Sequence, residues 1–380
     1  MSELDNYRVE IDEIDKELVE LIDKRMRVAE KVGSYKKENN LPVLDLARER
    51  IKLDKITDMA SEDMASYTRL LYNLIMDMSK DHQRKCNGVK AALISDIVRA
   101  LDNTGKVLPK RPVVACQGVT GAYSQQACDK IFDMPKVLYM KNFNGVFKAI
   151  NEGLCTYGVL PLENSTAGSV NQVYDLMMKY NFHIIKSVKL KIDHCLLALK
   201  GTKKEDIKEV FSHEQAIMQC DEYLKEMPGV KVTVCENTAV AAEKVAESGR
   251  KDVAAIASSS CGEIYGLEFV DEDIQDNGNN YTRFICIGKE LEIYPGAYKT
   301  SLMMTLPHRP GSLYNVLSRF YTLGINITKL ESRPISGKDF EFMFYFDIDV
   351  PVYSEEFIRL ISELESLSKD LRYLGSYSEL

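Results

Sequence analysis

The sequence predicts a multidomain protein that begins with an all-α segment and continues with α/β and α+β segments. Residues 4–85 carry apolar side chains at helical spacing, and residues 113–288 alternate short β-rich runs with helical patterns. From about residue 299 the order becomes strand, helix, strand, strand, helix, strand. A chain of 380 residues has room for two or three domains. We expect domains at residues 1–90, 112–288 and 298–377, with a linker at residues 91–111.

The composition argues against several classes of protein. Apolar residues make up 45% of the chain, charged residues 28%, and the formal net charge is -8, as in globular domains. There is no basic arm for a nucleic acid, no apolar run that would span a bilayer, and the acidic N-terminus is unlike a signal peptide. The nine cysteines form no C-x-x-C pair, and no His/Cys cluster has metal-ligand spacing. The sequence therefore predicts a cytoplasmic protein without a metal.

One continuous apolar seam predicts a long first helix. It ends at Asn39-Asn40-Leu41-Pro42, a second helix begins near Asp45, and a third covers roughly Tyr67 to Gln83. Three helices make too thin a core for a helix this long, so we expect a partner chain to cover the seam. The seam positions are Leu4, Tyr7, Ile11, Ile14, Leu18, Leu21, Arg25, Val28, Val32 and Tyr35.

Basic residues on the first helix suggest a site for an anion. Arg25 lies in the seam among apolar neighbours, where a guanidinium needs a partner. Lys36 faces nearly the same way about 16 Å further along, so the two side chains could close on one small anion. Arg8 lies about 25 Å before Arg25 and is rotated by roughly 100°, so it would join the site from a second protomer. From spacing alone, a helical dimer with snorkelling charges is the alternative.

The residue identities in this segment favour the anion site. Arg8, Arg25, Val32-Gly33-Ser34-Tyr35-Lys36 and the run from Asp45 to Glu49 resemble the all-helical chorismate mutase family over about residues 4–84. The resemblance implies a pericyclic rearrangement without a nucleophile or cofactor, in which the site holds a compact dicarboxylate and stabilises its ether oxygen. The implied chorismate-binding residues are Arg8, Arg25, Lys36, Asp45, Arg48, Glu49, Ser79 and Gln83.

The resemblance also implies a role for each of these residues. Arg8 from the other chain and Arg25 bind carboxylates, and Arg48 supports them. Lys36 and Gln83 donate to the ether oxygen, and Glu49 holds the substrate hydroxyl. The implied catalytic residues of this segment are therefore Lys36, Glu49 and Gln83.

In residues 113–288, small hydroxyl and amide residues gather where the predicted strands end. Ligands of open, mostly parallel α/β sheets bind at that edge, and several of these loops precede helices. Plain helix N-capping is the alternative for any one loop. Neither a dinucleotide fingerprint nor a Walker loop is present, so we expect no NAD or ATP and no other cofactor. The loops lie at residues 121–124, 163–166, 212–213 and 258–260.

Six motifs in this region resemble prephenate dehydratases, which implies a two-lobed fold like that of periplasmic binding proteins. Thr282 is the implied catalytic residue, because it can hydrogen-bond the hydroxyl that leaves prephenate. In a regular strand Thr282 and Phe284 share one face, so Arg283 is structural or reaches a carboxylate only through a twist. His213 is an acid or a structural histidine. The motifs are GVTGAYS, GVLPLENSTAGSV, DHCLL, FSHEQA, YGL and YTRF. The expected prephenate-binding residues are Asn164, Ser165, Thr166, Ser212, Thr282, Arg283 and Phe284.

The C-terminal segment resembles an ACT domain, a ferredoxin-like module that binds amino acids. The resemblance rests on HRPGSLYNVL, on GINITKLESRP and on the order of elements. It implies L-phenylalanine bound at a dimer interface; the alternative is that Gly311 only makes a turn and Arg333 only a surface pair. The implied ligands are Gly311, Ser312, Leu313, Glu331, Ser332 and Arg333.

Together the three resemblances imply a bifunctional enzyme, an isomerase and a lyase, that converts chorismate through prephenate to phenylpyruvate. Phenylalanine would regulate it, and the chain would form a homodimer or a larger homo-oligomer. Two alternatives stay open: a ligand-binding α/β receptor with an ACT sensor and an inert helical dimerisation segment, and a dehydratase whose mutase is vestigial.

Overall fold

The computed structural model describes residues 2–39, 41, 45–86, 92–308, 310–335 and 341–380. The chain forms two compact units, Met1–Ala92 and Leu93–Leu380. Among the described residues, no helix is at once long enough and apolar enough to cross a bilayer.

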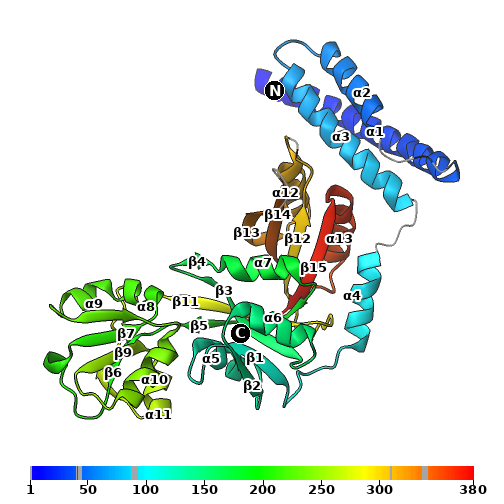
Figure 1. Cartoon of the computed structure of the whole chain (residues 1–380). Coiled ribbons are helices and arrows are strands. Elements are labelled where there is room, and N and C mark those ends of the chain that lie inside the picture. The colour runs from blue at the N-terminus through cyan, green and yellow to red at the C-terminus, as the bar shows by residue number, and fades with distance from the viewer. Residues whose placement is uncertain (1, 40, 42–44, 87–91, 309, 336–340) are drawn as a thin grey trace. The chain divides into compact units, whose positions relative to one another are not determined.

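The first unit consists of three helices, α1 (Glu3–Glu38), α2 (Leu46–Met59) and α3 (Ala65–Cys86) (Figure 1). A capping box starts α1, because the Ser2 side chain accepts from Asp5 N and the Asp5 carboxylate accepts from Ser2 N. Asn39 is the C-cap of α1, as the predicted helix end requires. Asn40 and Pro42 of that predicted end lie outside the described residues.

The first unit buries little of its apolar surface. Ala29 and Gly33 are the buried residues of α1. A Cβ atom on Gly33 would lie 3.1 Å from Gln83 Cβ, so glycine lets α1 and α3 approach closely here. Neither Ala29 nor Gly33 belongs to the predicted seam. Of the seam positions, Arg25 is half-buried and the others are exposed to solvent in the single chain, at Leu4, Tyr7, Ile11, Ile14, Leu18, Leu21, Val28, Val32 and Tyr35.

The second unit begins with two sheets that form separate lobes (Figure 1). The first lobe has the strand order β2-β1-β3-β11-β5 with β4 paired to β3, and the second has the order β10-β6-β9-β7-β8. The strands of the first lobe are β1 (Val113–Gln117), β2 (Lys136–Met140), β3 (Tyr157–Asn164), β4 (Gly168–Ser169), β5 (His183–Lys191) and β11 (Tyr281–Gly288). Those of the second are β6 (Cys195–Ala198), β7 (Glu209–Ser212), β8 (Lys231–Val234), β9 (Val253–Ala257) and β10 (Glu268–Asp271).

Helices connect the strands of both lobes, in line with the predicted alternation. The helices of the first lobe are α5 (Tyr123–Ile131), α6 (Phe143–Asn151) and α7 (Asn171–Lys179). Those of the second are α8 (Glu214–Gln219), α9 (Asp221–Lys225), α10 (Thr238–Ser248) and α11 (Ser259–Tyr265), with a 3-10 turn at Lys204–Asp206.

Both sheets are mixed, whereas the sequence predicted mostly parallel ones. Strand β1 pairs in parallel with β2 and β3, but β11 is antiparallel to both β3 and β5. The chain leaves the first lobe after β5 and comes back as β11, which enters between two strands that are already placed. Such a returning strand has no crossover helix that would make it parallel.

The last sheet of the second unit has the order β13-β14-β12-β15. Helix α4 (Ala92–Asn103) packs on this region, because its Ile97 and Ala100 are buried in one apolar cluster with Leu302 and Phe346. The stretch predicted as a linker therefore carries a helix that belongs to this core. The elements are β12 (Lys299–Thr305), α12 (Ser312–Thr322), β13 (Asn326–Pro334), β14 (Phe342–Asp349), α13 (Glu355–Leu367) and β15 (Asp370–Tyr377).

This sheet and the first lobe share one apolar core, which contains Leu160, Met303, Tyr345 and Leu374. The chain end is also joined to β5: Leu380 N donates to Ser187 O at 2.9 Å, and Lys189 N donates to Leu380 O at 3.0 Å. Strands β5 and β11 are thereby tied to the C-terminal sheet by both packing and backbone hydrogen bonds.

Candidate active sites

A pocket of about 270 Å³ lies between the three helices of the first unit. Five basic and two acidic side chains line it, a surplus of three positive charges. This charge suits a small dianion. The lining residues are Arg25, Val28, Ala29, Val32, Lys36, Asp45, Arg48, Glu49, Lys52, Met76, Ser79, Lys80 and Gln83.

Burial strengthens the positive potential of this pocket. Arg25 Nη1 donates to Ser79 Oγ and, at 3.3 Å, to the Ile75 carbonyl oxygen. Burial lowers the pKa of Arg25 from its ordinary value. Burial, and then the charges of Arg25 and Arg48, lower the pKa of Lys52. These cations are held close together without enough acidic neighbours, so a bound dianion would stabilise all of them.

The acidic and amide groups of this pocket are held by neighbouring helices. Asp45 is the N-cap of α2, and its Oδ1 accepts from Arg48 N at 3.0 Å. Glu49 forms an ion pair with Lys80 at 3.1 Å. Gln83 is 8% exposed, and its Oε1 has no hydrogen-bond partner within the described parts of the chain. A buried amide oxygen of this kind is a natural contact for a ligand.

Seven of the eight predicted chorismate-binding residues line this pocket, and the eighth, Arg8, does not. Arg8 is exposed, and its Nη1 lies 3.6 Å from the Asp5 carboxylate. Lys52 and Lys80 also line the pocket and were not among the predicted residues. Lys52 follows Arg48 by one helical turn, and that spacing was the available signal.

The second unit has a pocket of about 340 Å³ whose lining residues come from both lobes. The first lobe contributes Asn164 at the end of β3 and Thr282 and Phe284 on β11, and the second lobe contributes His213. Thr282 and Phe284 share the pocket face of β11, as the strand alternation predicted. The full lining is Gln117, Ala122, Tyr123, Ser124, Phe143, Pro161, Asn164, Val170, Ile192, His194, His213, Gln215, Ala216, Gln219, Glu236, Asn237, Thr238, Thr282 and Phe284.

The Thr282 hydroxyl is held by the side chain of Asn164. Asn164 Oδ1 accepts from the backbone N–H groups of Thr166 at 3.0 Å and Ala167 at 2.8 Å. Its Nδ2 donates to Thr282 Oγ1 at 2.9 Å and to Asn280 Oδ1 at 2.7 Å. The turn after β3 therefore orients the amide that contacts Thr282.

The same hydrogen-bonded chain continues into the second lobe. Asn280 Nδ2 donates to Gln219 Oε1 at 3.0 Å, and Gln219 Oε1 lies 2.9 Å from His194 Nε2. Asn280, Gln219 and His194 were not among the predicted site residues. His194 lies inside the DHCLL motif and Asn280 directly precedes YTRF, so these two could have been found from their motifs. Gln219 lies in none of the motifs.

Three predicted prephenate-binding residues, Ser165, Thr166 and Ser212, are not among the described lining residues. Ser212 is fully buried, and its hydroxyl donates to the Ile256 carbonyl oxygen at 2.7 Å. Ser165 Oγ accepts from Tyr281 N at 2.9 Å, so it ties two loops together. Thr166 acts through its backbone N–H. These three residues form hydrogen bonds with other residues of the chain, so they are not among the proposed substrate contacts.

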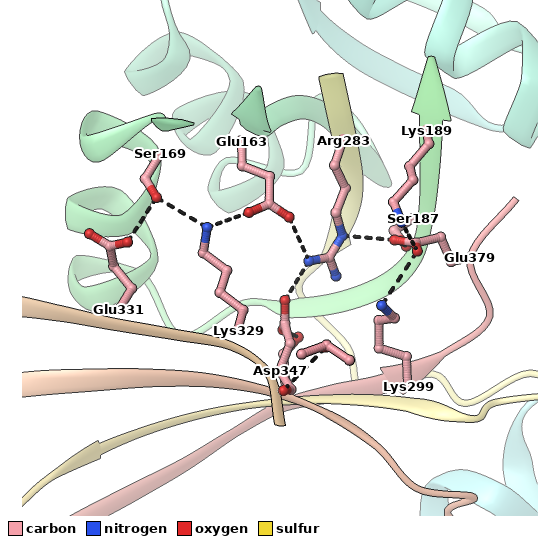
Figure 2. Close-up of polar contacts among 12 residues, drawn as sticks. Glu163, Ser169, Ser187, Lys189, Arg283, Lys299, Lys329, Glu331, Asp347 and Glu379 are labelled. Atoms are coloured by element: carbon pink, nitrogen blue, oxygen red, sulfur yellow. Dashed lines mark hydrogen bonds and ion pairs between the residues drawn. The ribbon is translucent and has the colours of Figure 1, made fainter. Parts of the chain in front are cut away.

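Arg283 likewise does not line the pocket, because it alternates with Thr282 and Phe284 along β11. Figure 2 shows its side chain among the carboxylates of Glu163, Asp347 and Glu379. The guanidinium is 4% exposed and forms ion pairs with Glu163 at 3.2 Å, with Asp347, and with Glu379 at 2.9 Å. Its Nη2 donates to Tyr377 Oη at 2.6 Å. Of the two expectations for Arg283, this environment favours the structural one.

Residues of the predicted effector motifs lie on α12 and β13. Gly311 is the N-cap of α12 with φ 83°, a backbone conformation that favours glycine. Glu331 Oε2 accepts from Ser169 Oγ at 2.9 Å, and Arg333 Nη2 lies 2.9 Å from the Asp175 carboxylate. Ser332 is exposed, and Leu313 packs against the C-terminal apolar cluster. Ser312 Oγ is buried and has no partner among the described residues.

Lys329 of β13 connects this region with the strand that carries Asn164 (Figure 2). Its Nζ forms an ion pair with Glu163 and donates to Ser169 Oγ at 3.1 Å. Burial alone would raise the pKa of Glu163, but Lys329 and Arg283 lower it below its ordinary value. In the described ranges, no group of three or more His, Cys, Asp or Glu side chains could hold a metal ion.

Comparisons with known proteins show two family matches along the chain. The chain matches the family chorismate mutase type II at residues 7–84 and the family prephenate dehydratase at residues 114–292. It is 30% identical over 380 residues to a bifunctional chorismate mutase/prephenate dehydratase of Escherichia coli (strain K12), covering 97% of this chain and 95% of that protein.

Two further similarities each cover 70% of the chain. An arogenate dehydratase/prephenate dehydratase 2, chloroplastic, of Arabidopsis thaliana is 40% identical over 276 residues, which is 70% of this chain and 72% of that protein. The crystal structure of a prephenate dehydratase from Arthrobacter aurescens in complex with L-Phe matches with a TM-score of 0.64 and 28% identity. That match covers 70% of this chain and 89% of the other.

Proposed function

The chain belongs to the family of bifunctional chorismate mutases/prephenate dehydratases, and from this premise we propose which of its residues carry each activity. It is an enzyme of phenylalanine biosynthesis that rearranges chorismate to prephenate and converts prephenate to phenylpyruvate. The observation that carries the assignment is the presence of two separate pockets, each lined by the residue types its reaction needs. We further propose three domains, at residues 1–90, 112–288 and 298–377, with a linker at residues 91–111; the family matches support the first two.

In the proposed mutase mechanism, the pocket of the first unit holds chorismate in a compact conformation. Arg25 and Arg48 bind carboxylates, and Glu49 accepts from the substrate hydroxyl. Lys36 and Gln83 donate to the ether oxygen, on which negative charge develops as its bond to carbon breaks. The surplus of positive charge in the pocket supports this scheme, because a charged donor strengthens as that charge develops. Asp45 and Ser79 complete the set by positioning Arg48 and Arg25.

In the proposed dehydratase mechanism, the pocket between the two lobes binds prephenate. The substrate dianion takes up one proton and loses its ring carboxylate as CO₂ and its hydroxyl as water, and the aromatic ring that forms drives the step. Thr282 donates to the leaving hydroxyl, Asn164 holds Thr282, and Phe284 packs on the ring. The hydrogen bond from Asn164 Nδ2 to Thr282 Oγ1 supports these roles, because it leaves the threonine hydrogen available. His213, which lines the same pocket, is a further candidate for a substrate contact.

We also propose that residues 298–377 form a ferredoxin-like ACT domain that binds L-phenylalanine and inhibits the dehydratase. Gly311, Ser312 and Leu313 would meet the amino acid at one side, and Glu331, Ser332 and Arg333 at the other. The order of elements supports the fold. The buried Ser312 hydroxyl supports a ligand, and the ion pair from Lys329 to Glu163 supports coupling, because Glu163 adjoins Asn164. Inhibition requires that phenylalanine favour the less active arrangement.

A homodimer is part of the proposal. The exposed apolar seam of α1 supports it, since a soluble single chain rarely exposes such a continuous apolar stripe. Arg8 is at the uncovered end of α1 and is absent from the pocket lining of its own chain, which suits a residue that enters the pocket of a partner. The eight cysteines whose side chains the structure describes are free and buried, which supports a reducing, cytoplasmic compartment.

Two single substitutions test the assignment, and each serves as the control for the other. Lys36→Ala should lower the mutase kcat by about 10²- to 10³-fold, the usual effect of removing one preorganised donor. Thr282→Ala should abolish phenylpyruvate formation. Each variant should keep the other activity, measured by loss of chorismate and by phenylpyruvate absorbance. Near-normal mutase turnover in Lys36→Ala, or continued phenylpyruvate formation in Thr282→Ala, would refute the respective role. Binding of both substrates to the native chain without turnover would instead favour a receptor.

A further inference from the structure

The hydrogen-bonded chain that joins Thr282 to His194 has a polarity that is fixed at one end. Backbone N–H groups can only donate, and those of Thr166 and Ala167 both point at one atom of the Asn164 amide, at 3.0 and 2.8 Å. That atom must be the oxygen. The other end of the amide is therefore the NH₂ group, which faces Thr282 Oγ1 and Asn280 Oδ1.

The orientation of Asn164 determines every later member of the chain. Because Asn164 donates to Asn280, the atom it meets is the Asn280 oxygen, and the Asn280 NH₂ group faces Gln219. Gln219 therefore presents its oxygen both to Asn280 and to His194 Nε2. His194 Nε2 must carry a hydrogen. Asn280 and His194 are each 2% exposed, so water cannot easily replace either partner.

This polarity determines what Thr282 can do in the pocket. Its oxygen accepts from Asn164 at 2.9 Å, and the described residues offer its hydroxyl no other hydrogen bond. The hydroxyl hydrogen is thus free to point at a ligand. If the Asn164 amide were reversed, Thr282 would donate to the amide oxygen and could offer only lone pairs to a leaving hydroxyl. Donor character at Thr282 therefore requires the Asn164 amide in its present orientation, and the Asn280 oxygen that accepts from its NH₂ group is one of the partners that hold it there.

We propose that Asn280 and His194 are positioning residues of the dehydratase, which act through Gln219 and Asn164 to keep Thr282 a hydrogen-bond donor. Neither touches the reacting atoms in this scheme. The inference rests on the proposed role of Thr282 and extends it across both lobes, because Gln219 is in helix α8 of the second lobe and the Asn164–Thr282 pair is in the sheet of the first. Burial lowers the pKa of His194, which favours the neutral ring with its one hydrogen on Nε2.

The first test changes one hydrogen-bond donor of this network into an acceptor, while the side chain keeps nearly the same shape. Asn280→Asp replaces the NH₂ group that faces Gln219 Oε1 with an oxygen, so two acceptors meet at about the present 3.0 Å. Asn279→Asp is the matched control, because it makes the same change at the neighbouring exposed residue. We expect Asn280→Asp to lower the dehydratase kcat by about 10- to 100-fold with little change in KM, and Asn279→Asp to behave like the native chain.

The second test uses His194, so that the inference does not depend on one variant. His194→Gln keeps an N–H donor toward Gln219, whereas His194→Phe keeps the ring and removes the donor. We expect His194→Gln to recover at least about tenfold more kcat than His194→Phe, because one buried acceptor regains its donor. A packing role for the ring would give the opposite order. Mutase activity, measured in the same preparations, shows whether the polypeptide of each variant is intact.

The outcomes separate this inference from the proposed function. If the native enzyme makes no phenylpyruvate, or Thr282→Ala remains active, the proposed function fails. If the native enzyme is active and needs Thr282, native kcat in Asn280→Asp would overturn the inference. Equal or reversed kcat values for His194→Gln and His194→Phe would also overturn it.

Discussion

Replacing Arg283 with methionine should destabilise the second unit by about 3–5 kcal/mol, the usual effect of removing one partner of a buried ion pair. The size of this destabilisation depends on which basic partners each carboxylate retains after the substitution. Glu163 retains Lys329, and Glu379 retains Lys189 at 3.0 Å and Lys299 at 3.4 Å. Asp347 is fully buried, and Arg283 is its only basic partner among the described residues. The variant therefore leaves the buried Asp347 carboxylate without a basic partner among the described residues.

A second substitution checks that reasoning. Asp347→Asn removes the charge that Arg283→Met leaves stranded, so the double variant should be more stable than Arg283→Met alone. The two residues contact each other, so their effects should be strongly non-additive. Additive losses would show that the pair is not the source of the effect.

Hydrogen exchange followed by mass spectrometry is a suitable assay, because it separates the peptides of β11 from the helices of the first unit. A loss of 3–5 kcal/mol corresponds to about two to four orders of magnitude in exchange protection. A change below about 1 kcal/mol together with a raised KM for prephenate would refute the structural role. It would return Arg283 to the substrate-binding residues.

The same ion pairs predict how stability depends on pH. Burial alone would raise the pKa of Glu163 and of Glu379, but basic neighbours that include Arg283 lower both below the ordinary 4.5. A lowered folded-state pKa means that each carboxylate stabilises the fold above pH 4.5, and that this contribution is lost as pH falls through the lowered value. Acidification in that range should therefore reduce protection of β11 more in the native chain than in Arg283→Met. Equal pH profiles would contradict this.

Two further substitutions test regulation and assembly. Lys329→Met should weaken phenylalanine inhibition by about 10- to 100-fold, because the lost charged hydrogen bond is worth about 1.5–3 kcal/mol, and basal turnover should persist. Lys200→Met, 88% exposed, is the control in the inhibition assay. Unchanged inhibition in Lys329→Met would disprove the coupling. Leu18→Glu should halve the mass measured by light scattering and abolish mutase activity, since the partner's arginine is lost. Val19→Glu, outside the seam, should do neither, and an intact, active Leu18→Glu oligomer would rule out this interface.

Local spacing was enough to place Arg25 and Lys36 beside one pocket, and the family resemblance implied the other residues of the mutase site. Arg25 and Lys36 share one face of a single helix, and helical geometry converts that spacing into a position in space. Strand alternation in the same way placed Thr282 and Phe284 on one face and Arg283 on the other. Where a single regular element carries the residues, the sequence alone determined their arrangement.

Tertiary structure alone decided which groups meet across elements. The partners of Arg283 come from residues 163, 347 and 379, and the chain from Thr282 to His194 passes through residues 164, 280 and 219. Ser212 looked like a ligand contact, but the Ile256 carbonyl oxygen of the neighbouring strand takes its hydroxyl. No spacing rule reports such pairings, because they depend on how strands β3, β11 and β14 come together. The sequence supplied the donors and acceptors, and the packing of the sheets determined their partners.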